Sequence, residues 1–253
     1  MGRTYQVTAI NLQCQSLGEA DRLLTILSPE RGLQRVVAPG ARKPHSPLAA
    51  LTGRLTVNRL ELRVGRSLDR IVQATLVRSH QHLAQDYTRW VVAQYFAELV
   101  LGQALVNAHQ GDLFDTFGRL LAEVAHLSPE DPWPLVVQGL WQLLTLAGWQ
   151  PQVRLCCWTG GPVSPQQRLG FSIPLGGLVR LPLPPTVPPC RVLSPDQVQL
   201  LQALADPPWP PAAPWRSLEP LLRGYAEYHL ERPIRSASLL YSTITPASSL
   251  AGS

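Results

Sequence analysis

The chain has 253 residues, 45% of them hydrophobic, and carries a net charge of +5. Such a length and composition allow one large domain or two, and they exclude a chain that is disordered throughout. The most apolar windows, near residues 91–106 and 135–149, are interrupted by glutamines and fall short of the roughly 20 apolar residues that a membrane-spanning helix needs. The first residues contain no apolar signal core. We therefore expect an intracellular protein that makes no contact with a membrane.

The positive charge is concentrated in residues 1–80. This segment has eleven Arg and one Lys against five acids, a net charge of +7, whereas the remaining 173 residues have ten Arg against twelve acids, a net charge of −2. A basic segment of this kind is typical of proteins that bind a polyanion, most often nucleic acid. The alternative is a solvated Arg-rich face that reflects composition only, since the chain has one Lys against 21 Arg.

The first 80 residues have the patterns of β-strands. Two short apolar runs, 23–27 and 33–37, are separated by Ser28-Pro-Glu-Arg-Gly32, and a turn with Pro and Gly between two such runs predicts a hairpin. Apolar and charged residues alternate over 59–64, as in a half-buried strand. About five strands separated by turns predict a small closed or partly closed barrel.

From about residue 81 the apolar residues recur with helical spacing. Ser128 has the sequence context of a helix cap, Gly148 is expected to end a helix, and Ser194 with Gln197 predicts a capping box. The predicted helices cover about 83–106, 113–124, 134–147, 195–204 and 217–231. Residues 151–220 contain sixteen of the 25 prolines, which predicts extended chain packed on the helices; a ligand for a proline-binding domain is the alternative.

Signatures of catalysis are missing from the sequence. It contains no G-x-S-x-G, no phosphate-binding Gly loop, no H-E-x-x-H and no D-x-D pair. We therefore expect no enzymatic activity, no catalytic residue and no cofactor.

A basic turn, residues 38–46, is the most informative local feature. It places Arg42 and Lys43 on a loop that follows the predicted hairpin, and loops of small barrels often bind single strands. Tyr5 is the only Phe, Trp or Tyr in residues 1–80, so binding should depend on phosphates and be weakly sequence-specific. The predicted nucleic-acid contacts are Arg35, Arg42, Lys43, Arg63, Arg66 and Arg70.

The run SLGEADRLLTILSPERGLQRVVAPGARKPHS (16–46) resembles the N-terminal signature of the RecO family of bacterial recombination-repair proteins. The matching residues include the G-E-x-D-R-L-L motif that begins at Gly18 and the A-x-G-A-R motif that begins at Ala38. Three further segments resemble the closing strand of that family's barrel, the helix that leads to its metal loop, and its C-terminal tail: GRSLDRIVQATLV (65–77), LLTLAGWQPQVRLC (143–156) and RPIRSASLL (232–240).

The resemblance implies an α+β multidomain protein. Its N-terminal OB-fold β-barrel would cover 1–80, and an all-α C-terminal domain with a Pro-rich loop region would cover 81–245. A degenerate zinc-loop insertion would lie at about 151–192, and a flexible tail at 246–253.

The resemblance also implies a function. Members of the family bind single- and double-stranded DNA, anneal complementary strands and, with RecR and often RecF, help to load RecA onto strands coated by single-stranded-DNA-binding protein. Such a protein would be cytoplasmic and nucleoid-associated. Two alternatives stay open: an OB-fold module that binds RNA, and a protein-interaction scaffold that binds no nucleic acid.

The cysteines depart from the family pattern. Many members hold zinc with a C-x-x-C-G, a Gly-Gly turn and a second C-x-x-C. Here Cys156 aligns with the first ligand, Thr159 replaces the second, and no cysteine follows Gly176-Gly177 until Cys190. We therefore expect no bound metal.

A partner site is expected in the helical region. The family's partner, the single-stranded-DNA-binding protein, typically ends in an acidic, apolar tail, and a receptor for such a tail needs an apolar pocket beside a cation. Arg89, Trp90 and Arg119 are the candidates, although each Arg read singly fits a solvated helix face.

Overall fold

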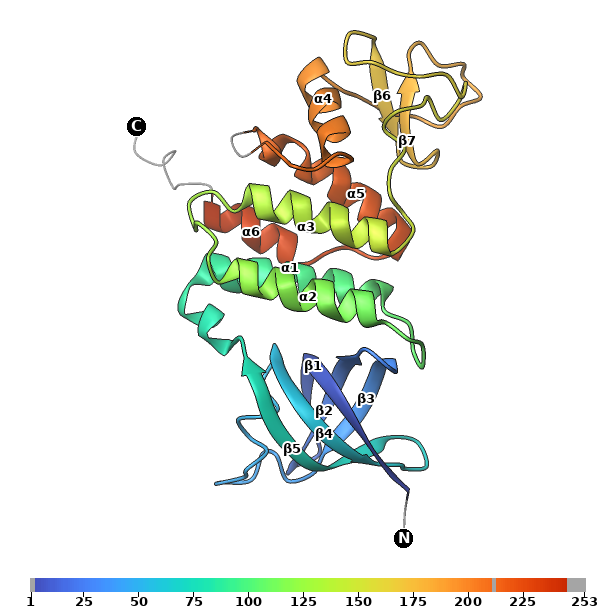
Figure 1. Cartoon of the computed structure of the whole chain (residues 1–253). Coiled ribbons are helices and arrows are strands. Elements are labelled where there is room, and N and C mark those ends of the chain that lie inside the picture. Colours follow the sequence, from blue (N-terminus) through green and yellow to red (C-terminus); the bar gives the residue numbers. More distant parts are fainter. Residues whose placement is uncertain (1–2, 211–212, 245–253) are drawn as a thin grey trace. The chain divides into compact units, whose positions relative to one another are not determined.

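The computed structural model describes residues 3–210 and 213–244 (Figure 1), so the tail expected at 246–253 lies outside the described residues. The chain divides into two compact units, the first ending at His126 and the second beginning at Leu127. The first unit therefore contains two helices in addition to the strands that precede residue 80.

Five strands form a closed barrel in the order β1-β2-β3-β5-β4 (Figure 1), which confirms the predicted N-terminal β-barrel. All neighbours are antiparallel except β3 and β5, which pair in parallel. The alternation of apolar and charged residues over 59–64 matches their burial. Leu60 and Leu62 belong to the apolar core, whereas Arg59 and Arg63 are exposed. The strands are β1 (Thr4–Leu17), β2 (Asp21–Ser28), β3 (Gly32–Ala38), β4 (Thr56–Arg63) and β5 (Asp69–Ser79).

The β2–β3 hairpin contacts the loop between the first two helices. Gly32 has a φ of +60°, and a Cβ at this position would lie 2.2 Å from the Leu105 carbonyl oxygen, so only Gly fits. Leu33 N–H donates to the same oxygen at 2.8 Å, and Gln110 N–H donates to the Pro29 carbonyl at 2.7 Å. These bonds join the helices to the barrel within one unit.

Helix α1 (Tyr87–Gln103) begins later than its apolar stripe suggests. The Asp86 carboxylate accepts a hydrogen bond from Arg89 N–H at 2.8 Å and so caps the helix, while the residues before it form the 3-10 turn η1 (Gln81–Gln85). The predicted extension to Val106 was wrong, since Val106 is exposed in the loop and bridges to β3. Helix α2 (Gly111–Val124) matches its prediction.

The second unit contains most of the predicted helices: α3 (Trp133–Leu146), α4 (Pro195–Leu204) and α5 (Glu219–Leu230). The capping box of Ser194 and Gln197 is confirmed, and Gly148, with a φ of +74°, follows the end of α3. The predicted cap at Ser128 was wrong. Its hydroxyl donates to the Glu130 carboxylate at 3.2 Å, and α3 begins five residues after it.

Two elements of the second unit were missed by the sequence patterns. A three-stranded sheet lies in the proline-rich region, with the order β7-β6-β8: β6 (Leu169–Ser172), β7 (Gly177–Arg180) and β8 (Arg191–Val192). Helix α6 (Ser236–Ile244) follows Pro233, where the last helix was expected to end. The C-terminal region is thus helical as expected, and its loop region also contains a small sheet.

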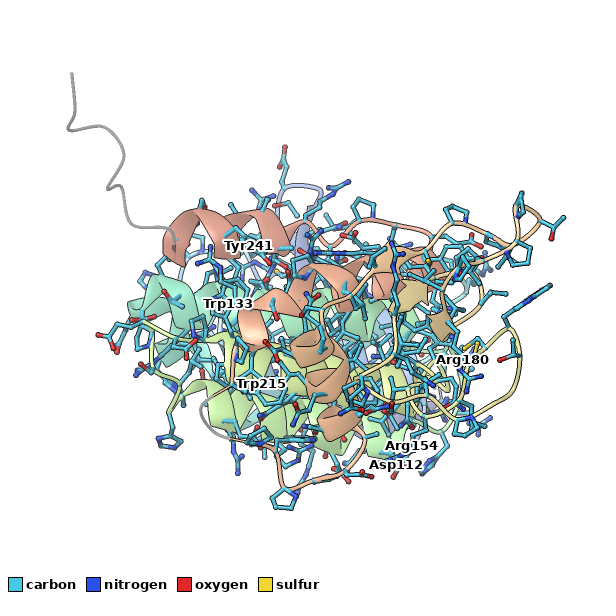
Figure 2. The ribbon with its side chains drawn as sticks, turned by 90° about the horizontal axis from the view of Figure 1, so that it is seen from above. Asp112, Trp133, Arg154, Arg180, Trp215 and Tyr241 are labelled. Carbon is cyan, nitrogen blue, oxygen red and sulfur yellow. The ribbon has the colours of Figure 1, made fainter. Side chains whose placement is uncertain are left out.

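Contacts between α3, α5 and α6 explain why α6 forms. The Tyr241 ring lies 4.9 Å from the Trp133 ring (Figure 2 labels both residues). The Tyr241 hydroxyl donates to the fully buried Glu219 carboxylate at 2.5 Å. Arg223 Nε lies 3.0 Å from the same carboxylate.

Among the described residues, no helix has the length and apolar character required to cross a bilayer.

Candidate nucleic-acid interface

The basic turn is bound to the β1–β2 turn by three hydrogen bonds. Gly40 N–H donates to Asp21 Oδ1 at 2.8 Å, and Arg42 N–H donates to the Ala20 carbonyl at 2.8 Å. The Arg42 guanidinium donates to the Gly18 carbonyl at 2.6 Å. The loop is therefore held in place, and the exposed Arg42 and Lys43 extend from a defined position. Asp21 thus has a structural role in this turn.

Two arginines lie directly opposite each other on neighbouring strands. The register of β4 and β5 pairs Arg63 with Arg70, and both side chains are exposed. Like charges in directly opposite positions destabilise a sheet unless an anion lies between them. Asp21 Oδ2 lies 3.5 Å from Arg70, in an exposed pair that contributes little energy. Asp21 thus connects this arginine pair to the basic loop.

The six residues predicted to contact nucleic acid do not all lie close together on the barrel. Asp21 contacts Arg70, which pairs with Arg63, and it also bonds to the loop that carries Arg42. We call Arg42, Arg63 and Arg70 the arginine cluster. Arg35 is exposed on β3, two residues before the Val37 that pairs with Arg70, and Arg66 is exposed in the turn between β4 and β5.

Two further exposed arginines, Arg3 and Arg59, lie on or beside β4 and were not predicted as contacts. The Arg3 carbonyl accepts a hydrogen bond from Val64 N–H at 3.0 Å, so Arg3 lies beside the end of β4 next to Arg63. Arg59 is on the same outward-facing row of β4 as Arg63. The alternation of apolar and charged residues in β4 could have identified Arg59. The position of Arg3 follows from the pairing of β1 with β4, which the sequence does not reveal.

Tyr5, the only Phe, Trp or Tyr in residues 1–80, is half-buried against the core of the barrel. The Arg31 guanidinium lies 4.0 Å from the centre of the Tyr5 ring. The Tyr5 hydroxyl donates to the Asp69 carboxylate and accepts a hydrogen bond from Gln34 at 2.9 Å. Burial and the neighbouring Asp69 raise the pKa of Tyr5, so the hydroxyl stays protonated. The barrel therefore offers many exposed cations but one half-buried aromatic ring, which an arginine already covers.

The residues expected to bind a partner tail lie on α1 and α2. Arg89 and Trp90 are half-buried in the first turn of α1, and Arg119 is exposed on α2. Arg119 forms an ion pair with Glu123 at 2.8 Å, so its charge is already partly compensated. The partner-tail site stays a prediction.

The second unit contains a pocket that sequence reasoning missed. It has a volume of about 380 Å³, lies beside β6 and α5, and is mostly apolar. Phe171, Ile173 and Leu221 line it together with prolines, and Arg191 is the cation in its lining. Its residues come from three separate segments, so no local pattern pointed to it.

The loop between Leu155 and Pro162, which contains Cys156 and Cys157, is held by hydrogen bonds, and we call it the cysteine loop. Arg180 N–H donates to the buried Cys156 Sγ at 3.3 Å. Burial raises the pKa of the Cys156 thiol, but hydrogen bonds from the Thr159 side chain and from the backbone of Arg180, Thr159 and Trp158 outweigh this effect and lower the pKa to about 7. Within residues 3–210 and 213–244, no group of three or more His, Cys, Asp or Glu is placed to hold a metal.

Comparison with known families covers nearly the whole chain. The family model described as Recombination protein O N terminal matches residues 1–80, and the one described as Recombination protein O C terminal matches residues 84–238. The chain belongs to the RecO family. This membership confirms the resemblance seen in the motifs that begin at Gly18 and Ala38, and it makes the chain a DNA repair protein of the RecO type.

Relatives of similar length support this membership. The DNA repair protein RecO of Synechococcus elongatus is 42% identical over 261 residues, which cover 97% of this chain and 97% of the relative. The RecO proteins of Acaryochloris marina and Gloeobacter violaceus are 39% and 40% identical, and the matches cover 97% of this chain in both cases and 97% and 95% of the relatives.

Proposed function

We propose that this RecO family member binds single- and double-stranded DNA through the arginine cluster of its barrel and anneals complementary strands. With RecR, and with RecF where it takes part, it would help to load RecA onto strands coated by single-stranded-DNA-binding protein. The role is non-catalytic and places the protein at the nucleoid. The proposal combines the family membership with the charges on the barrel surface.

The pairing of Arg63 with Arg70 is the observation that supports DNA binding most directly. The two arginines are directly opposite each other on neighbouring strands, so one phosphate could accept charge-assisted hydrogen bonds from both. The adjacent Arg42 loop supplies a further cation at a fixed position. Contacts of this kind read the backbone and carry no sequence information.

Annealing requires that the protein hold strands without reading their bases. A cationic surface lowers the repulsion between two phosphate backbones, and weak sequence preference lets the strands slide into register. Recognition of coated strands needs a second contact to the coat protein. Two candidate sites for its acidic, apolar tail are the surface of α1 and α2 that carries Arg89 and Arg119, and the apolar pocket that Arg191 helps to line.

Annealing of complementary DNA oligonucleotides, bare and coated with single-stranded-DNA-binding protein, tests the proposal. We expect Arg63→Ala with Arg70→Ala to slow both reactions. Arg78→Ala is the matched control, since it removes an exposed arginine from β5 eight residues away, about 26 Å along an extended strand.

Two results would contradict the proposal. Binding of RNA with no annealing of coated DNA would indicate an RNA-binding module. Failure of the intact chain to bind either nucleic acid would indicate a protein-interaction scaffold, with its arginines reflecting composition alone.

A further inference from the structure

Residues 151–192 form a basic lobe within the second unit. The lobe contains four arginines and no Lys, Asp or Glu, a net charge of +4, whereas the other residues of 127–253 have four arginines against seven acids. The lobe includes the small sheet of β6, β7 and β8 and the cysteine loop. Its charge therefore differs in sign from that of the segments that precede and follow it within 127–253.

An exposed indole lies at the tip of the cysteine loop. Trp158 is 50% exposed and Leu155, at the base of the same loop, is 43% exposed. The loop backbone is nevertheless well bonded: Cys157 N–H donates to the Leu178 carbonyl at 2.8 Å, and Gly160 N–H donates to the Cys156 carbonyl at 2.8 Å. A firmly held turn that exposes a large apolar ring loses the free energy of burying it, which points to a binding role.

Cations lie against the same turn. The Arg180 guanidinium lies beside Gly161, where an added Cβ would be 3.2 Å from Nη2, and it donates to the Pro162 carbonyl. Arg154 is on the strand-like segment that leads into the loop and is ion-paired with Asp206 (Figure 2 labels Arg154 and Arg180). The Arg168 carbonyl accepts a hydrogen bond from Leu181 N–H at 3.0 Å, which places the exposed Arg168 next to the end of β7.

We propose that the basic lobe is a second nucleic-acid site, specific for unpaired DNA, in which Trp158 stacks on a base and Arg180 and Arg168 contact the flanking phosphates. An indole can stack on a splayed base of a single strand, whereas the bases of a duplex are already stacked on each other. Arginines beside the ring bind the backbone without reading sequence.

This site deepens the proposed function and rests on it. The barrel supplies cations and one half-buried aromatic ring that an arginine covers, whereas the lobe supplies an exposed ring. Two strand contacts on one chain would let the barrel hold one strand while the lobe presents the bases of an unpaired segment. The protein would then prefer single strands to duplex for a reason that charge alone does not provide.

Binding of oligo(dT) to the full-length chain tests this site. We expect Trp158→Ala to weaken binding at least about five-fold, since stacking of one base contributes roughly 1–3 kcal/mol. Trp158→Phe should retain most of the affinity, because a phenyl ring still stacks. Binding of a duplex of the same length should be unchanged in both variants. Tyr228→Ala is the matched control, since it removes another exposed ring, 53% exposed, from α5 of the same unit.

Photocrosslinking locates the contact. An oligonucleotide that carries 5-bromodeoxyuridine should crosslink to the peptide that contains Trp158, and Trp158→Ala should remove that crosslink. Unchanged oligo(dT) affinity in Trp158→Ala would overturn the inference, as would an equal loss in Tyr228→Ala. If Arg63→Ala with Arg70→Ala still weakens DNA binding in that case, the proposed function survives the failure of the second site.

Discussion

Asp21 and Gly40 are joined by a hydrogen bond of 2.8 Å from the Gly40 backbone N–H to the Asp21 carboxylate. Gly40 has a φ of +66°, a conformation that favours glycine, and it begins the turn that carries Arg42 and Lys43. The other oxygen of Asp21 lies 3.5 Å from Arg70. One carboxylate therefore both positions the basic loop and offsets part of the charge next to it.

Substitutions at Asp21 should separate these two roles. Asp21→Asn keeps an oxygen that can accept from Gly40 and removes the negative charge, so we expect DNA binding to be equal or tighter. Asp21→Ala also removes the acceptor, and unfolding in urea should show a loss of about 1–2 kcal/mol. Weaker DNA binding by Asp21→Asn would mean that the pairing with Arg70 is needed to orient that arginine.

Loss of Arg42 and Lys43 should be visible in the salt dependence of binding. The double replacement with Ala should weaken binding to single strands of every sequence and reduce the slope of log K against log salt by about 1.4, at roughly 0.7 for each lost phosphate contact. Titration at several salt concentrations measures the slope. An unchanged slope would show that these side chains face away from DNA.

Charge reversal at Arg89 and Arg119 should abolish binding of the partner's tail peptide and leave binding of bare DNA intact. Glu123→Ala is the matched control, because it breaks the ion pair of Arg119 and keeps the cation. Fluorescence anisotropy of a labelled tail peptide measures the effect. Normal peptide binding by both reversed variants, with loss only in Arg191→Glu, would place the receptor at the pocket beside α5.

Metal analysis of the purified protein should find no stoichiometric zinc, and a chelator should leave the melting temperature unchanged. One tightly held zinc ion per chain would contradict this expectation and would show that Cys156, Cys157 and Cys190 converge on a metal.

The Cys156 thiol should instead make stability depend on pH. Its pKa in the folded protein is lowered to about 7 from an ordinary value of 9.0, so the thiolate stabilises the fold fully above about pH 9, and that contribution is lost as the pH falls through 7. Urea unfolding at about pH 6 and about pH 9 should therefore show a rise that Cys156→Ser reduces. An identical rise in Cys156→Ser would assign the pH dependence to another group.

Tyr241→Phe should destabilise the second unit. It removes a hydrogen bond to the buried Glu219 carboxylate, and bonds to charged groups contribute about 1.5–3 kcal/mol. Urea unfolding followed by tryptophan fluorescence should show this loss. Tyr228→Phe is the control, since its ring is exposed, and an equal loss in both variants would show that the Glu219 contact contributes nothing specific.

Local patterns in the sequence determined the barrel and most helices. Alternation at β4, the Pro-Gly turn before β3 and the capping box of α4 each depend on residues close together in the chain, and each was confirmed. The excess of arginine in residues 1–80 was likewise readable from composition. Composition alone did not identify a class of protein, whereas the motifs near Gly18 and Ala38 identified the RecO family of DNA repair proteins.

Only the tertiary structure determined which charged and aromatic residues lie next to each other. The pairing of Arg63 with Arg70 follows from a bulged register, and the bond from Gly40 to Asp21 joins residues nineteen positions apart. The short strands β6 to β8 and the helix α6 are too brief to form by local preference, and they depend on packing against distant segments, as Tyr241 does on Trp133 and Glu219. Contacts of this kind are set by the closure of the barrel and the burial of whole elements, which no stretch of sequence encodes alone.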